Sequence, residues 1–195
     1  MSRTATIERN TKETQITVEI DLDGSGASDL ATGIGFFDHM LTHLAKHGLL
    51  DLSVRCKGDL EVDAHHTVED VGISIGKAIA QALGDKAGLT RYGSSTVPMD
   101  EALVMTALDI SGRGSLAYTS TVCKEMVGQF DSELAPEFFK SLCANAGINA
   151  HIRQLDGSNA HHVIEAAFKS FARALRQAVS LDPRIQGVPS TKGTL

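Results

Sequence analysis

The chain has 195 residues, of which 42% are hydrophobic and 22% are charged, a balance typical of a globular protein with a buried core. The formal net charge of −6 argues against a nucleic-acid partner, because no basic surface is available to neutralise phosphates. The sequence has no apolar run of membrane-spanning length and no apolar N-terminal segment typical of a signal peptide, so we expect a cytoplasmic protein with no membrane partner.

The three cysteines, Cys56, Cys123 and Cys143, are widely spaced and form no CxxC pair. An odd number of cysteines at such spacings is typical of small buried side chains in a reducing compartment. We therefore expect no disulfide framework.

Strand and helix patterns follow one another in the first half of the chain. Ile16, Val18 and Ile20 alternate with polar residues, which predicts a half-buried strand. Apolar residues between His66 and Leu83 recur every four positions, which predicts a helix. Together these patterns predict strands at 3–10, 14–22 and 49–57 and helices at 36–46 and 66–83.

The second half of the chain repeats this order of elements. It predicts strands at 101–111, 115–122 and 148–155, a helix that opens after Pro136 and ends near Gly147, and a helix at 161–179. Each half, residues 1–90 and 91–195, is therefore a ββαβα unit, and the repeat indicates gene duplication. The predicted fold class is α+β, with two similar sheets covered by helices in one compact domain.

The pattern His-His-x-x-Glu occurs once in each half, at equivalent places. The two copies are His65-His66-x-x-Glu69 and His161-His162-x-x-Glu165. On a helix the first histidine and the glutamate share a face, whereas adjacent histidines diverge by roughly 100° and can hardly hold one ion together. We therefore expect two metal sites that draw ligands from both copies. Nitrogen and oxygen ligands without a thiolate suit Mn²⁺, Fe²⁺, Zn²⁺ or Co²⁺.

A second group of histidines precedes the first motif. His39, His43 and His47 form a row along the predicted helix at 36–46, so one or more of them is a candidate for a further imidazole ligand. The alternative is a polar helix face. Glu137 stands at the matching place in the second half and is also a candidate ligand.

Basic residues suggest that an anion binds near such a centre. Arg91 and Arg113 lie in segments that turn tightly, Lys169 follows His161 on the same predicted helix, and Lys192 lies in the tail VPSTKGTL. Each alone is more typical of a solvated charge, but together with a metal centre they predict a phosphate clamp to which Ser and Thr hydroxyls contribute. The tail is either disordered or a loop that closes on a ligand.

Several segments, spread from about residue 7 to the C-terminus, resemble the imidazoleglycerol-phosphate dehydratase family of histidine biosynthesis. They are RNTKET, GFFDHMLTHLAKHG, DAHHTVEDVGISIGKA, RYGSSTVPMDEAL, DISGRG, HIRQLDGSNAHHVIEAAFKSFARAL and VPSTKG. The resemblance is to the monofunctional form, because no phosphatase domain precedes these segments. It implies two four-stranded sheets flanking a layer of four helices, like domain 2 of ribosomal protein S5. The two halves then form one metal-binding catalytic domain.

The resemblance also implies an activity and an assembly. The activity is dehydration of imidazole glycerol phosphate, a small phosphorylated substrate, to imidazole acetol phosphate through a metal-stabilised imidazolate. Two Mn²⁺ ions per subunit serve this chemistry, because a metal on the ring helps to expel the neighbouring hydroxyl as water. Loss of the adjacent proton then yields an enol that becomes the ketone. The assembly is a homo-oligomer of 24 subunits with active sites at the interfaces between subunits.

Individual residues take their implied roles from the matching motifs. One ion is implied at His39, His66, His161 and Glu165, and the other at His65, Glu69, Glu137 and His162. At Glu137 the chain reads APEFF, whereas the family has a histidine in the corresponding VEHFF, although glutamate also binds Mn²⁺. The catalytic residues implied are Glu13, as acid or base, with His65 and Glu165. Substrate and phosphate contacts are implied for Glu13, His39, His47, Arg91, Arg113, Lys169, Ser190, Thr191 and Lys192.

Two other classes of protein fit parts of the pattern. A dinuclear hydrolase also uses histidine and glutamate ligands, but the chain lacks the DxH and HExxH signatures of such enzymes. A metal-buffering protein would not require the set of basic residues. Turnover of imidazole glycerol phosphate distinguishes the three classes.

Overall fold

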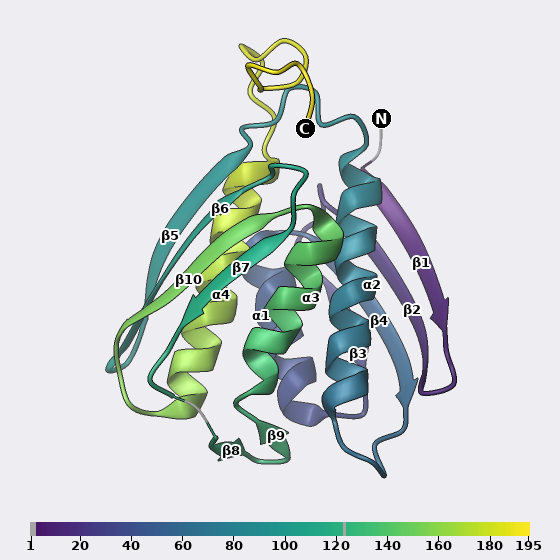
Figure 1. The fold of residues 1–195 in the computed structure, drawn as a ribbon, viewed down its shortest axis with the longest axis vertical. Helices are drawn as coiled ribbons and strands as arrows, with labels where there is room; N and C mark the ends of the chain where they lie inside the picture. Colours follow the sequence, from purple (N-terminus) through teal and green to yellow (C-terminus); the bar gives the residue numbers. More distant parts are fainter. Residues whose placement is uncertain (1–2, 123) are drawn as a thin grey trace.

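The computed structural model describes residues 3–122 and 124–195. Two four-stranded sheets stand on either side of a layer of helices (Figure 1). This arrangement confirms the predicted α+β class. Within the described ranges, no helix is long and apolar enough to cross a membrane.

The two sheets have the same strand order, which is the structural trace of the duplication. The first sheet contains β1 (Thr4–Asn10), β2 (Thr14–Asp21), β3 (Ser28–Ala31) and β4 (Asp51–Gly58) in the order β1-β2-β4-β3. The second contains β5 (Tyr92–Met99), β6 (Ala102–Asp109), β7 (Ser115–Thr119) and β10 (Asn149–Asp156) in the order β5-β6-β10-β7. In each sheet the last strand in this order pairs parallel to its neighbour, and the other pairs are antiparallel.

Four helices fill the space between the sheets, and they pair across the two halves. They are α1 (Gly35–Gly48), α2 (His65–Leu83), α3 (Leu134–Ala146) and α4 (Ala160–Val179). Helix α1 packs against α4, and α2 packs against α3. A short hairpin of β8 (Met126–Val127) and β9 (Phe130–Asp131) precedes α3.

Each four-stranded sheet contains one strand more than the ββαβα unit predicted from the sequence, and the hairpin of β8 and β9 was not predicted either. The strands missed in the sheets, β3 and β5, lie at sheet edges, where one side of the backbone has no partner strand in its sheet. Strand β3 has four largely exposed residues and shows no alternation. Strand β5 contains Gly93 and Pro98, residue types that weaken a strand pattern but are tolerated at an edge. The other expected elements are present with shifted ends.

The core lies where the helices meet the sheets. Phe37, Phe138, Phe168 and Phe171 are fully buried, and their rings provide much of its volume. Burial of each such ring removes roughly 150–250 Å² of surface from water. The helices therefore gain most of their stability from packing, not from their intrinsic propensity.

The cysteines behave as the sequence predicts where they are described. Cys143 is buried and Cys56 is half-buried, and both are free thiols. Burial raises the pKa of Cys143 to about 12 and that of Cys56 to about 11, so both thiols are protonated and unreactive at neutral pH. Cys123 lies outside the described residues.

Candidate functional site

Both His-His-x-x-Glu motifs occupy the first turns of their helices. Helix α2 begins at His65, whose backbone N–H is bound by the Asp63 carboxylate at 2.7 Å. Helix α4 begins one residue before His161, and the Asn159 side chain caps it by accepting the N–H of His162. In Figure 1 these two helices start at the lower end of the molecule and run upward. The sheets and loops therefore carry both motifs to the same end.

The motif on α4 lies in a cluster with histidines of α1. The carboxylate of Glu165 is buried, and its Oε2 lies 3.1 Å from His161 Nε2, 3.2 Å from His39 Nε2 and 3.3 Å from His43 Nε2. The other oxygen, Oε1, lies 2.5 Å from Lys169 Nζ. Three imidazole nitrogens from two helices therefore converge on one carboxylate oxygen.

The charge states in this cluster suit a cation. Burial alone would raise the pKa of Glu165, but the hydrogen bond and charge of Lys169, together with His43 and His161, more than offset it, and the pKa lies at about 2. Burial also lowers the pKa of His43 to about 4. At neutral pH the cluster therefore offers an ionised carboxylate and a neutral imidazole. The donors of His39, His43 and Glu165 all lie within 4.8 Å of one another, and this set of nitrogen and oxygen atoms fits a divalent transition-metal ion.

The motif on α2 faces a different hollow. His65 Nε2 lies 4.0 Å from Glu69 Oε2, and His65 shares a hollow of about 820 Å³ with Glu137 of α3. The Glu137 carboxylate also contacts Lys140 at 3.1 Å. The segment between β4 and α2 contributes Leu60 to the same hollow. Three of the four ligands implied for the second ion thus lie near the start of α2 or line the hollow beside it.

In each motif the second histidine points away from the first. The rings of His65 and His66 lie at 90° to each other and those of His161 and His162 at 73°, as the helical geometry predicts. His66 Nδ1 lies 2.9 Å from Asp59 Oδ2, and its Nε2 lies 3.9 Å from Glu13 Oε1.

His162 Nδ1 lies 2.7 Å from Glu101 Oε2, and its Nε2 lies 3.6 Å from Asp100 Oδ2. The contacts described for His66 and His162 are thus to carboxylates of neighbouring loops, and neither histidine belongs to the Glu165 cluster.

The residues of the predicted phosphate clamp lie at the opposite end of the molecule, with one exception. A hollow of about 580 Å³ between the tail and the start of the second sheet is lined by Arg91, Arg113, Ser190, Thr191 and Lys192. The Arg91 guanidinium is held by the Asp109 carboxylate at 2.7 and 3.2 Å and by the Pro189 carbonyl at 2.7 Å. Arg91 is therefore fixed in position, and Arg113 and Lys192 add positive charge to the pocket.

Lys169 is the exception, because it lies midway along α4 beside Glu165 and not in the tail pocket. Its Nζ also contacts Met99 Sδ at 3.5 Å. His47 belongs to the same region, since its ring stacks on that of His43 with centroids 5.6 Å apart. The structure thus places these two predicted substrate contacts with the histidine cluster.

The length of α4 separates the tail pocket from the motifs. Arg91 N–H donates to the Ala178 carbonyl at 2.9 Å, which fixes Arg91 at the C-terminal end of α4. His161 lies at the N-terminal end, and a rise of 1.5 Å per residue puts roughly 25 Å between these two ends. Figure 1 shows the tail at the upper end of the molecule, away from the helix starts.

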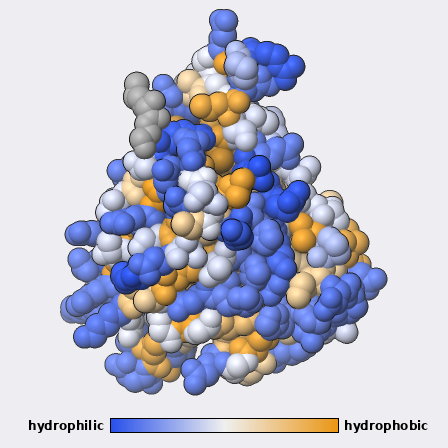
Figure 2. All heavy atoms as spheres, turned by 180° about the vertical axis from the view of Figure 1, so that it is seen from behind, coloured by the Kyte–Doolittle hydropathy of each residue, from blue (hydrophilic) through white to orange (hydrophobic). Residues whose placement is uncertain are grey.

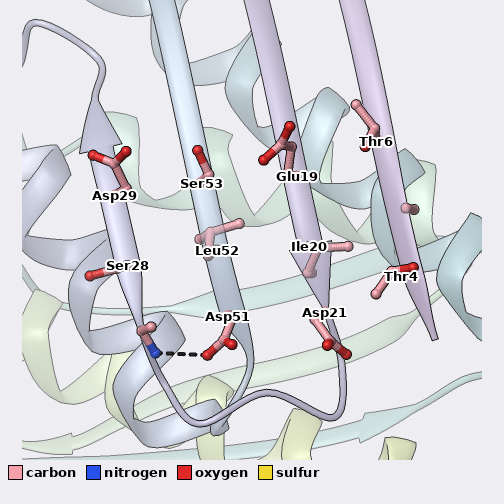
Figure 3. Close-up of a pocket in the computed structure, with 12 residues that line it drawn as sticks. Thr4, Thr6, Glu19, Ile20, Asp21, Ser28, Asp29, Asp51, Leu52 and Ser53 are labelled. Carbon is pink, nitrogen blue, oxygen red and sulfur yellow. Dashed lines mark hydrogen bonds between the residues drawn. The ribbon is translucent and has the colours of Figure 1, made fainter. Parts of the chain in front are cut away.

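A further hollow in the described part of the chain contains no histidine. This hollow, of about 420 Å³, lies on the outer face of the first sheet, where Figure 3 shows Thr6, Glu19, Ser53 and Asp29 side by side on four strands. At the edge of this hollow, the Asp51 carboxylate accepts a hydrogen bond from the Ala27 N–H at 2.9 Å. Figure 2 shows the molecule from behind the view of Figure 1, where most of the surface is hydrophilic and the hydrophobic groups are scattered.

The sequence did not indicate two residues of the site, Asp59 and Glu101, and it indicated a third, His43, only as part of a group. His43 was only one of three candidates in a row, although its spacing of four from His39 was the available signal. Glu101 lies 61 residues before His162, and Asp59 lies seven residues before His66 in the loop that leads into α2. No spacing rule links them.

The paired sheets and the clustered histidines and carboxylates at helix N-termini define a class of protein, an α+β enzyme with an internally duplicated fold. A family model described as imidazoleglycerol-phosphate dehydratase matches residues 32–175. The chain therefore belongs to the imidazoleglycerol-phosphate dehydratase family, and it is a hydro-lyase.

Relatives and solved structures agree with this assignment. The chain is 56% identical over 195 residues to imidazoleglycerol-phosphate dehydratase of Lachnoclostridium phytofermentans, with 100% of both chains covered. It is 59% identical over 196 residues to that of Acidiphilium cryptum, again with 100% of both covered.

The solved structure from Staphylococcus aureus matches with a TM-score of 0.83 at 40% identity, covering 92% of this chain and 99% of that one. The structure from Pyrococcus furiosus, in complex with (S)-C348, matches with a TM-score of 0.84 at 38% identity, covering 97% and 100%.

Proposed function

We propose that this protein dehydrates imidazole glycerol phosphate to imidazole acetol phosphate in histidine biosynthesis, with two Mn²⁺ ions per subunit. The observation that carries the proposal is the convergence of three imidazole nitrogens on Oε2 of Glu165. This convergence brings together α1, from the first half of the chain, and α4, from the second half, and the donor atoms that they contribute suit a cation. Family membership supports the substrate and the reaction.

The nitrogen and oxygen donors present suit two ions, although within the described part of one chain no contact joins His66 or His162 to the donors with which it is grouped. One would be held by His39, His161 and Glu165 with His66, and the other by His65, Glu69, Glu137 and His162. The Glu165 cluster already has the ionised carboxylate and the neutral imidazole that a transition-metal ion requires. When bound, such ions supply Lewis-acid polarisation to the substrate.

The protein's own residues bind the substrate and move its protons. Arg91, Arg113 and Lys192 bind the phosphate, with Ser190 and Thr191 as hydroxyl donors in the tail pocket. Glu13 is half-exposed beside His66, where its carboxylate is free to take the proton from the carbon that becomes the ketone carbon.

The reaction requires more than one copy of the chain. The substrate's ring and phosphate are joined by a three-carbon chain, which spans only a fraction of the roughly 25 Å between the motifs and the tail pocket. We therefore place each active site at an interface, where the tail pocket of one subunit meets the motifs of another in a 24-subunit assembly. Leu60 and Met126, which line the hollow beside His65, are 40% and 62% exposed and suit coverage by a second copy.

Incubation of the Mn²⁺-loaded protein with imidazole glycerol phosphate tests the proposal. We expect imidazole acetol phosphate to accumulate without release of inorganic phosphate. Phosphate release without the ketone would indicate a hydrolase and overturn the proposal. Metal binding without turnover of the substrate would indicate a metal buffer and would equally overturn it.

A further inference from the structure

A carboxylate lies behind the second histidine of each motif. Glu101 Oε2 lies 2.7 Å from Nδ1 of His162, and Asp59 Oδ2 lies 2.9 Å from Nδ1 of His66. The two carboxylates come from different places in the duplicated unit. Asp59 directly follows β4, whereas Glu101 lies in the turn between β5 and β6.

The chemistry of these contacts fixes which nitrogen carries the ring proton. An ionised carboxylate can only accept a hydrogen bond, so Nδ1 of each neutral imidazole must donate. The lone pair of the ring is then on Nε2, the atom that points away from the carboxylate. An imidazole held in this tautomer is ready to bind a metal through Nε2 without first moving a proton.

The two halves differ at one equivalent position. Glu13 directly precedes β2 and Glu101 directly precedes β6, and these strands occupy the same place in the two sheets. In the second half the turn carboxylate holds the histidine at Nδ1. In the first half Asp59 occupies Nδ1, and Glu13 lies instead 3.9 Å from Nε2, on the ligand side of His66.

We propose that Glu101 and Asp59 are positioning residues that lock His162 and His66 in the Nδ1–H tautomer, and that Asp59 thereby leaves Glu13 free for proton transfer. This inference rests on the proposed function, since it takes both histidines to be metal ligands. It assigns the two carboxylates a role in metal affinity and not in the chemical step.

The hydrogen bonds of Glu101 make an isosteric variant diagnostic. Its Oε1 accepts the backbone N–H of Asn159 at 2.9 Å while its Oε2 faces His162. In Glu101→Gln the side chain keeps one oxygen, which can accept from only one of these two groups. The backbone N–H of Asn159 can only donate, so it retains the oxygen. The amide NH₂ then faces Nδ1 of His162 and favours the tautomer with the proton on Nε2, which blocks that atom.

Asp59 should respond differently to the same kind of change. Its Oδ1 is buried and has no hydrogen-bond partner among the described residues. No donor there would therefore lose an acceptor if this oxygen were replaced by an amide nitrogen. In Asp59→Asn the amide can keep its oxygen on Nδ1 of His66 and turn its NH₂ toward the unpartnered side. Asp59→Ala, in contrast, removes the acceptor altogether.

Two measurements test the inference with these variants and with Glu8→Gln, an exposed position on β1, as the matched control. ¹⁵N magic-angle-spinning NMR of the metal-free assembly, with ¹³C,¹⁵N-labelled histidine, reports the tautomer of each ring. Titration with Mn²⁺, followed by the electron paramagnetic resonance signal of the free ion, reports affinity. Neither readout depends on activity.

We expect Glu101→Gln to convert one histidine to the Nε2–H tautomer and to weaken Mn²⁺ binding about 10- to 100-fold. We expect Asp59→Ala to weaken binding similarly, with Asp59→Asn and Glu8→Gln close to wild type. Wild-type tautomers and affinity in Glu101→Gln would overturn the inference. A wild-type protein that binds no Mn²⁺ would instead overturn the proposed function, and the tautomer spectra would still decide whether the carboxylates lock the rings.

Discussion

Glu165 shows how a buried charge is prepared for a ligand. Burying a carboxylate without a partner costs several kcal/mol, and here Lys169 on the next turn of α4 supplies the compensating charge. The other oxygen, Oε2, faces three imidazoles, which are weak electrostatic partners when they are neutral. This crowding is costly without a cation, as expected of a cluster that binds one.

Replacement of Glu165 by glutamine should therefore abolish one metal site while the chain still folds. The amide is neutral and leaves Lys169 without its partner, so Mn²⁺ affinity at this site should fall on the order of a hundredfold or more. Metal content after dialysis should decrease from two ions to one per subunit. Retention of both ions in Glu165→Gln would show that this carboxylate is not a ligand.

Glu13 should behave in the opposite way. Its side chain is 54% exposed and 3.9 Å from His66, so Glu13→Gln should leave metal content unchanged. Because the amide cannot accept the substrate's proton, kcat should fall on the order of a hundredfold or more. Single-turnover kinetics with the metal-loaded variant measure this effect. A wild-type rate would remove Glu13 from the mechanism.

At the level of elements, the closest helix contact is between α2 and α3. A Cβ placed on Gly76 would lie 2.5 Å from the Leu142 carbonyl oxygen, and one on Gly72 would lie 2.8 Å from the Phe138 carbonyl oxygen. The absence of side chains at these two positions therefore allows the backbones to approach. This contact joins the two halves, because α2 belongs to the first and α3 to the second.

Gly76→Ala tests the importance of that close approach. Alanine improves helix propensity by about 1 kcal/mol, but the overlap with backbone atoms of α3 costs about 1–3 kcal/mol. We expect a net loss of up to about 2 kcal/mol in the free energy of unfolding, measured by urea denaturation of the metal-free protein. Gly35→Ala is the control, because a Cβ there has nothing within 4 Å. Equal stability of the two variants would contradict the packing argument.

The predictability of the elements followed the strength of their periodicity. The apolar residues of α2 recur over its whole length, so its position could be read from the sequence nearly to the residue. Strand β3 is short and exposed, and no pattern marks it. The pairing of α1 with α4 depends on contacts between segments far apart in the chain, which spacing rules do not reach. The two His-His-x-x-Glu motifs could therefore be predicted from the sequence. The contacts of His43 with Glu165 and of Glu101 with His162 could not.

At the scale of the whole molecule, the two parts of the proposed active site are too far apart to act together within one chain. The His-His-x-x-Glu motifs lie at one end of the molecule, and the tail pocket with Arg91 lies roughly 25 Å away at the other end of α4. Contact between unlike ends of identical subunits is a heterologous interaction, which closes only in a symmetric assembly. The arrangement thus predicts that the isolated subunit is inactive, even with metal bound.

Complementation between two inactive variants tests this prediction directly. Glu165→Gln damages the metal end and Arg91→Ala damages the tail pocket, so homogeneous assemblies of either variant should be nearly inactive. In a co-expressed, equimolar mixture, about one quarter of the interfaces should combine an intact metal end with an intact pocket from another subunit. Activity should therefore recover to about one quarter of the wild-type value. If both parts of a site came from the same subunit, every site in the mixture would carry one lesion, and no activity would return.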